Sequence, residues 1–126
     1  IVSGSQQTLD LASKLFIDSG TEVLVEAPTY LAALQSFQLF GAECLAVPQQ
    51  ADGPDLAALR ATLEQHEPAF AYLIPTFQNP SAVRYSEAKR DAVAALLDEF
   101  GVTLLEDEPY RELVFDQGSA KPIVSR

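Results

Sequence analysis

The chain has 126 residues, of which 48% are hydrophobic and 21% are charged, and this balance is ordinary for a globular domain. Its 8 basic and 18 acidic residues give a formal net charge of -10, which would repel phosphates, so we expect no nucleic-acid partner on this segment. No apolar run reaches membrane-spanning length, and no secretory signal is visible. The single Cys44 excludes an internal disulfide and suits a reducing compartment, so we expect a cytoplasmic protein without a membrane partner.

The start of the chain is unusual. Methionine is absent, including at position 1, and the chain opens directly in the apolar, strand-like pair Ile1 and Val2. We therefore expect one partial domain over residues 1–126, cut from a longer polypeptide. The alternative is processing at the N-terminus alone.

Apolar residues recur with helical spacing in four segments, and short apolar runs between them are typical of strands. Gly20, Gly41 and Gly101 are plausible helix stops, and Ser86 is a plausible N-cap. The expected elements are, in order, a helix at 5–17, a strand at 22–26, a helix at 28–41, a strand at 44–47, a helix starting at 52–54, a strand at 69–74, a helix at 86–100 and a strand at 102–105. The tail at 116–126 is polar, and we expect it to be loose.

Alternation of strands and helices predicts an α/β fold with a mostly parallel sheet between two helical layers. In such sheets, ligands bind at the carboxyl ends of the strands. Polar motifs occur there after two of the expected strands, namely 75–82, which contains Asn79, and 106–110, which contains Asp107 and Tyr110. An amide, a carboxylate and a phenol that converge in this way suit an aromatic nitrogen heterocycle with a phenolic oxygen.

Four motifs in this order resemble the fold type I aminotransferases that use pyridoxal phosphate (PLP). They are residues 3–7, 26–30, 79–82 and 106–110. The closest resemblance is to the group of 2-aminoadipate and kynurenine aminotransferases and to the aminotransferase-like domains of MocR-type regulators. It extends over essentially the whole chain and implies a partial large, cofactor-binding domain of that fold. It also implies that the strands at 69–74 and 102–105 are neighbours, with 22–26 beside the first and 44–47 at an edge. Residues 1–3 would be frayed or paired with another chain.

The resemblance implies a role for each candidate residue. Ser5 and Gln6 would hold the cofactor phosphate at a helix N-terminus, which suits an anion. Tyr30 would stack on the cofactor ring. Asn79 and Tyr110 would bind the phenolic oxygen, and Asn79 would also contact the substrate carboxylate. Asp107 would keep the pyridine nitrogen protonated, which makes the ring a better electron sink.

Each of these residues also has a plainer interpretation. Ser5 could only cap its helix, Tyr30 could pack against the apolar side of its own helix, Asn79 could form an Asn-Pro turn, and Asp107 could be a solvated acid. The family pattern Asn-Pro-Thr-Gly is Asn79-Pro80-Ser81-Ala82 here. The alanine in place of glycine is the larger departure, because glycine often serves backbone angles that alanine resists.

The family's catalytic lysine, which binds the cofactor covalently, is missing. It lies in a Ser-x-x-Lys context beyond the Asp-x-x-Tyr motif, and neither Lys14, Lys89 nor Lys121 matches that context. The substrate-carboxylate arginine of complete enzymes is also absent. We therefore expect no catalytic residue within the chain and no activity of the chain alone. His66 is the only histidine and has no evident second ligand, so we expect a surface histidine and no metal site.

The sequence thus predicts part of a cytoplasmic, homodimeric PLP-dependent aminotransferase that moves an amino group from an amino acid to a 2-oxo acid. One alternative is a MocR-type transcriptional regulator, in which the same domain senses a ligand and a helix-turn-helix domain lies upstream. A second alternative is an α/β interaction domain without PLP. The absence of a Gly-x-Gly-x-x-Gly fingerprint weakens a dinucleotide-binding interpretation.

Overall fold

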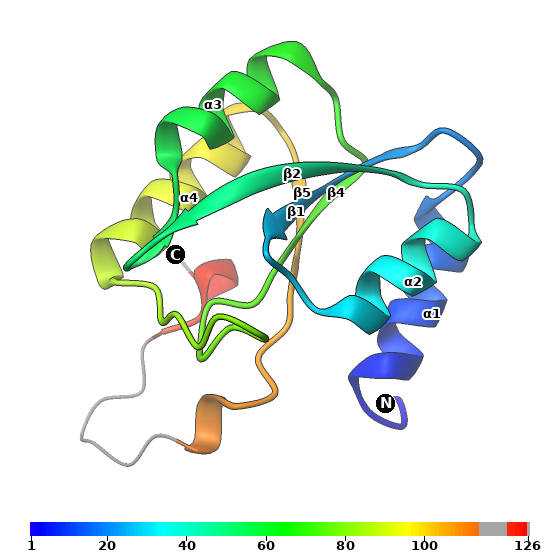
Figure 1. Cartoon of the computed structure of the whole chain (residues 1–126), viewed down its shortest axis with the longest axis horizontal. Helices are drawn as coiled ribbons and strands as arrows, with labels where there is room; N and C mark the ends of the chain where they lie inside the picture. Colours follow the sequence, from blue (N-terminus) through cyan, green and yellow to red (C-terminus); the bar gives the residue numbers. More distant parts are fainter. Residues whose placement is uncertain (114–120, 126) are drawn as a thin grey trace.

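A computed structural model describes residues 1–113 and 121–125. Five strands form one mixed, mostly parallel sheet in the order β3-β2-β1-β4-β5 (Figure 1). The strands are β1 (Glu22–Ala27), β2 (Glu43–Gln50), β3 (Gly53–Pro54), β4 (Phe70–Leu73) and β5 (Thr103–Glu106). The helices are α1 (Ser5–Phe16), α2 (Leu31–Leu39), α3 (Leu56–Gln65), α4 (Glu87–Glu99) and two short 3-10 helices, η1 (Arg111–Leu113) and η2 (Ile123–Ser125).

The expected three-layer arrangement is confirmed. Helices α1 and α2 cover one face of the sheet, and α3 and α4 cover the other (Figure 1). Alternate side chains of β4 explain how one strand serves both layers: Phe70 and Tyr72 enter the cluster under α1 and α2, whereas Ala71 and Leu73 enter the cluster under α3 and α4. A strand that is buried on both faces reads as a continuous apolar run, as this one does.

The predicted neighbours pair as expected. β4 lies parallel to β5 and to β1, and β2 lies parallel to β1 on the other side. β2 is close to the edge, since only Gln49 and Gln50 at its end have a second partner, the short antiparallel β3. At the start of the described chain, residues 1–3 form no strand and are exposed.

Two helix starts differ from the prediction. The helix expected at residue 28 begins at Leu31, because Tyr30 has an extended backbone conformation and serves as its N-cap. The helix expected at 52–54 begins at Leu56, because Gly53 and Pro54 pair with β2 instead. A Cβ at Gly53, whose φ is 137°, would meet side-chain atoms of Lys89 and Tyr85 at 3.2 Å. The glycine is therefore required by both its backbone angle and its close packing.

The tail is only partly as expected. Residues 116–120 and 126 lie outside the described part of the chain, so the prediction of a loose segment stands untested there. The prediction is wrong for η2, where Ile123 is 3% exposed and packs with the cluster under α4. Glu106 accepts hydrogen bonds from the backbone N–H groups of Ile123 and Val124 at 2.8 and 3.1 Å, which ties η2 to the end of β5.

Candidate functional site

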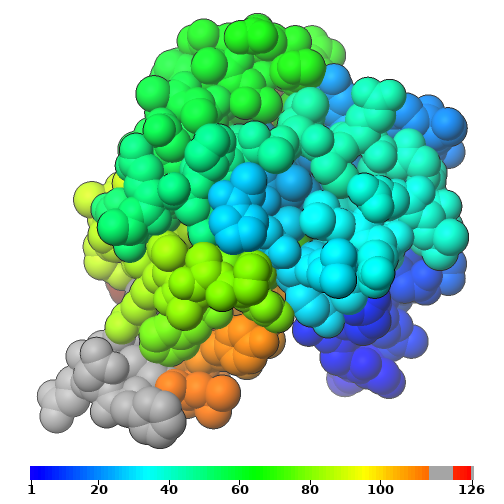
Figure 2. All heavy atoms as spheres, in the orientation of Figure 1, coloured from blue at the N-terminus to red at the C-terminus, as the bar shows by residue number. Residues whose placement is uncertain are grey.

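Five of the six predicted cofactor-binding residues line one pocket at the carboxyl ends of β4 and β5. The pocket has a volume of about 140 Å³. Its lining consists of Ser5, Tyr30, Ile74, Asn79, Asp107, Pro109 and Tyr110. These residues come from four separate parts of the chain, namely α1, the turn before α2 and the segments that follow β4 and β5. Figure 2 shows the segment that follows β4 lying directly against the segment that follows β5.

The sixth predicted residue, Gln6, is exposed and does not line this pocket. It lies beside Ser5 in the first turn of α1. Ser5 and Asp107 also line a second pocket of about 120 Å³, together with Thr8 and Tyr72. The two small pockets therefore share the start of α1 and the carboxylate of Asp107.

The N-terminus of α1 lacks a side-chain cap. Its N-cap is Gly4, with φ 84°, and no side chain of the described residues accepts a capping hydrogen bond there. Ser5 is the first helical residue and does not act as the simple cap that was the plainer interpretation. Unpaired N–H groups in the first turn of a 12-residue helix attract an anion by their partial positive charge. The start of α1 is therefore suited to a phosphate.

Asp107 supplies a carboxyl group to the pocket. Its backbone N–H donates to the carbonyl of Leu73 at 2.9 Å, which extends the pairing of β4 with β5 by one residue. The Tyr72 hydroxyl donates to Asp107 Oδ2 at 2.8 Å. Burial raises the pKa of the Asp107 carboxyl above its ordinary value, the hydrogen bond from Tyr72 opposes that rise, and the charge of Glu108 adds to it. Asp107 is thus a half-buried carboxyl group that accepts a hydrogen bond from Tyr72, and not a solvated acid.

Gln78 joins the loop that carries Asn79 to the turn that carries Tyr30. Its side chain is 1% exposed, and its amide nitrogen donates to the carbonyl of Pro28. Its carbonyl oxygen accepts from the N–H and the hydroxyl of Ser81 at 2.8 and 2.7 Å. Tyr30 also packs against the cluster under α2, so its plainer interpretation and its place in the pocket both hold.

Ala82 is the alanine that stands where the family pattern has glycine, and its backbone has a conformation that glycine adopts more easily. Its φ is 59°, in the left-handed region that favours glycine. Its N–H donates to the carbonyl of Gln78 at 2.6 Å, so the loop closes despite the alanine. A left-handed conformation costs an L-residue roughly 1–2 kcal/mol. The substitution therefore adds strain to the loop without opening it.

Some residues of the site were not predicted from the sequence. Tyr72, Gln78 and Thr76 each make a partly buried side-chain hydrogen bond next to the pocket. The apolar run 69–74 predicted the strand that contains Tyr72, but nothing in the sequence indicated that its hydroxyl reaches Asp107. Gln78 lies within the polar motif 75–82, but a glutamine in a loop is normally exposed, so its burial was not expected.

His66 lies outside the pocket lining, and its Nδ1 is 2.6 Å from Glu22 Oε1. In the part of the chain that the structure describes, no group of three or more His, Cys, Asp or Glu side chains could hold a metal ion. No helix of that part is long and apolar enough to cross a membrane.

Comparison with known families decides what kind of protein carries this pocket. The family model described as "Aminotransferase class I and II" matches residues 1–126. The chain belongs to this family. Within this aminotransferase family, a similar curated protein is the 2-aminoadipate transaminase of Thermus thermophilus, which is 45% identical over 117 residues. That match covers 93% of the chain and 30% of the relative.

Solved aminotransferase structures agree with the fold. LysN, the alpha-aminoadipate aminotransferase of Thermus thermophilus, superimposes with a TM-score of 0.93 and 43% identity, over 96% of this chain and 31% of LysN. LysN was solved in complex with N-(5'-phosphopyridoxyl)-L-leucine, a PLP derivative.

The chain is also 32% identical over 127 residues to YdcR, an uncharacterised HTH-type transcriptional regulator of Escherichia coli, with coverage of 100% of this chain and 27% of YdcR. The chain thus spans about a third or less of the length of these relatives.

Proposed function

We propose that the whole protein containing this chain transfers an amino group from an amino acid to a 2-oxo acid with the aid of PLP. The observation that carries the proposal is the single pocket in which an uncapped helix start, an aromatic ring, an amide, a half-buried carboxylate and a phenol meet. The donor set fits the cofactor, because a phosphate, a flat ring, a phenolic oxygen and a ring nitrogen each have a suitable partner.

The roles follow from the chemistry of each group. Ser5, Gln6 and the first-turn N–H groups of α1 bind the phosphate. For Gln6 the support is only its place in that turn. Tyr30 packs against the ring face. Asn79 and Tyr110 donate to the phenolic oxygen, and Asn79 also orients the substrate carboxylate.

Asp107 holds a proton at the pyridine nitrogen through an ion-paired hydrogen bond. Tyr72 donates to Asp107 Oδ2, and Oδ1 would remain available to the ring nitrogen. When bound, PLP supplies an electron sink for the electron pair left at the substrate α-carbon. The carboxylate strengthens that sink by keeping the nitrogen charged.

The lysine that holds the cofactor must come from outside these residues. Lys14 pairs with Asp10 on the exposed side of α1, and Lys89 donates to Gln50 and to the carbonyl of Pro54. Neither these two nor Lys121 lines the pocket. We also propose that the whole protein is a cytoplasmic homodimer, by analogy with the family.

The test uses the whole purified protein. We expect bound cofactor absorbance that disappears when an amino acid is added and returns with a 2-oxo acid. A protein that shows no cofactor absorbance after incubation with PLP would instead favour the interaction domain without PLP.

A second candidate function is supported by the similarity to YdcR. In that case the same pocket would sense a ligand within a transcriptional regulator. Two observations separate the candidates: a basic helix-turn-helix segment upstream of Ile1, and specific DNA binding by the whole protein without sustained amino transfer. Sustained turnover without such a segment favours the enzyme.

A further inference from the structure

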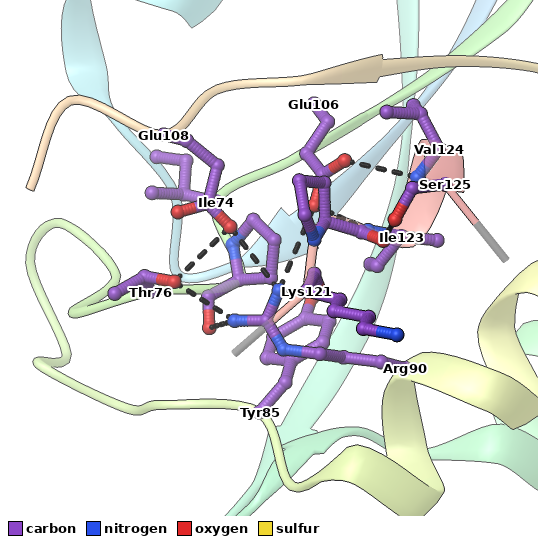
Figure 3. Close-up of polar contacts among 12 residues, drawn as sticks. Ile74, Thr76, Tyr85, Arg90, Glu106, Glu108, Lys121, Ile123, Val124 and Ser125 are labelled. Carbon is purple, nitrogen blue, oxygen red and sulfur yellow. Dashed lines mark hydrogen bonds and ion pairs between the residues drawn. The ribbon is translucent and has the colours of Figure 1, made fainter. Parts of the chain in front are cut away.

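Arg90 is a fully buried cation that the proposed chemistry does not use. It lies on α4, its side chain is 0% exposed, and its guanidinium reaches the segments that follow both β4 and β5 (Figure 3). Burying an unpaired charge is costly, so the identity of its partners shows what the residue holds in place.

On one side Arg90 binds the segment that follows β4. Its Nη2 donates to the carbonyl of Pro75 at 2.9 Å and to Thr76 Oγ1 at 2.8 Å. Asn79 lies three residues further along this segment. The guanidinium therefore holds the start of the loop that brings Asn79 to the pocket.

On the other side Arg90 lies against the two acids that flank Asp107. Its Nη1 is 3.2 Å from Glu108 Oε1 and 3.7 Å from Glu106 Oε1. The side chains of Glu106 and Glu108 both point toward Arg90 (Figure 3). Asp107 lies between them in the chain and lines the pocket. Thr76 completes the arrangement, since its hydroxyl donates to Glu108 Oε1 at 3.0 Å.

Backbone pairing alone does not hold the two segments together. Their ladder runs up to Leu73 and Glu106 and is followed by one more bond, from Asp107 N–H to the Leu73 carbonyl. Beyond that point, no backbone-to-backbone hydrogen bond joins the two segments within residues 1–113 and 121–125. The Arg90, Thr76 and Glu108 side chains make the connection instead.

We infer that Arg90, with Thr76 and Glu108, is a positioning group that holds the Asn79 loop and the Asp107 segment in the relative placement that cofactor binding requires. The inference rests on the proposed function, because it concerns the same pocket. It assigns no contact with cofactor or substrate to these residues.

Thr76 provides the sharpest test, because loss of Arg90 would leave two buried acids uncompensated and could prevent folding. Thr76→Val keeps the side-chain shape and removes the hydroxyl that joins Arg90 to Glu108, whereas Thr76→Ser keeps the hydroxyl. Arg60→Met is the control for loss of an arginine pair, since Arg60 binds Glu99 on the surface between α3 and α4, away from the pocket. All variants are made in the whole protein, and their thermal unfolding is recorded.

Two quantities are measured for each variant. The first is hydrogen exchange in residues 75–82 and 106–111 of the cofactor-free protein, and the second is the dissociation constant for PLP. We expect Thr76→Val to speed exchange in both segments and to weaken PLP binding about tenfold, because the variant loses the hydrogen bonds of the hydroxyl with Arg90 and Glu108. Thr76→Ser and Arg60→Met should remain within about twofold of the parent.

The outcomes distinguish a positioning role at the cofactor pocket from a role in the stability of the fold alone. Faster exchange in Thr76→Val with unchanged PLP affinity means that the group only stabilises the fold, and the inference is overturned. Unchanged exchange and unchanged affinity overturn it as well. A parent protein that binds no PLP, while Thr76→Val still exchanges faster, overturns the proposed function and with it the role at the pocket, although the coupling of the two segments stands.

Discussion

The hydroxyl of Tyr72, in β4, donates to Oδ2 of Asp107 at a distance of 2.8 Å. Asp107 is the residue that directly follows β5. The two residues are 35 positions apart in the chain and meet because β4 and β5 are parallel neighbours. The bond favours the ionised carboxylate and opposes the rise in pKa that burial causes. Tyr72 therefore helps to keep a charge at the place where the pyridine nitrogen is expected.

Tyr72→Phe in the whole protein should shift the pH profile of amino transfer. Loss of the donor raises the pKa of Asp107 further, so the carboxylate is protonated at a higher pH and the acid limb of the profile moves upward. The rate should fall most at low pH and recover as pH rises. Single-turnover rates across the pH range measure the shift. Tyr85→Phe is the control, because that buried tyrosine donates to Glu26 and not to Asp107. Superimposable profiles for Tyr72→Phe and the parent would contradict the prediction.

Asp107→Asn should slow the same half-reaction by roughly a thousandfold, which corresponds to about 4 kcal/mol of transition-state stabilisation. The amide keeps the shape but cannot hold the proton on the ring nitrogen. PLP binding should weaken much less, since the start of α1 still binds the phosphate. Absorbance in single-turnover experiments gives the rate, and titration gives the affinity. A near-parental rate with cofactor bound would show that Asp107 is not the partner of the ring nitrogen.

Glu26→Gln should flatten the pH dependence of stability. Glu26 is 1% exposed at the end of β1, and burial raises the pKa of its carboxyl above 4.5 despite hydrogen bonds with Tyr85, Ile74 and Gln49. The folded state then binds a proton more tightly than the unfolded state. The free energy of unfolding therefore falls as pH rises from 4.5 through the raised value.

Urea unfolding of the whole protein between about pH 4 and pH 8 measures this slope. Glu43→Gln, at the exposed start of β2, controls for the change in net charge. An equal slope in Glu26→Gln and the parent would show that another group is responsible.

Ala82→Gly should stabilise the protein by about 0.5–1 kcal/mol, because glycine adopts a φ of 59° without the steric cost that alanine bears. The gain is partly offset by the greater freedom of glycine in the unfolded chain. Ala95→Gly, at an exposed position in α4, is the matched control and should destabilise by about 1 kcal/mol. Chemical denaturation measures both changes. Destabilisation by Ala82→Gly would contradict the strain assigned to this loop.

The isolated 126-residue chain should not catalyse amino transfer. No lysine of the chain lines the pocket, so the covalent attachment that the family chemistry needs is not available within it. The assay is turnover of amino acids with 2-oxoglutarate, compared with free PLP as the control. Turnover above that control would overturn the assignment of the missing lysine.

The sequence alone determined the order of strands and helices and the positions of the polar motifs. Strands buried on both faces, such as β4, are visible as continuous apolar runs, and parallel pairing places their carboxyl ends at one edge. Those local patterns predicted that Asn79, Asp107 and Tyr110 converge, and the resemblance to the aminotransferases added Ser5 and Tyr30; all five line one pocket.

Only the tertiary structure decided how that pocket is supported. The bond from Tyr72 to Asp107, the link from Gln78 to Pro28 and the burial of Arg90 between two acids join residues far apart in the chain. A tyrosine, a glutamine or an arginine has no local pattern that shows which distant group it will meet. The same reason explains β3 and η2, because each forms only where a neighbouring element offers hydrogen bonds to a short segment. Local propensity selects elements, whereas burial of polar groups forces a particular long-range partner.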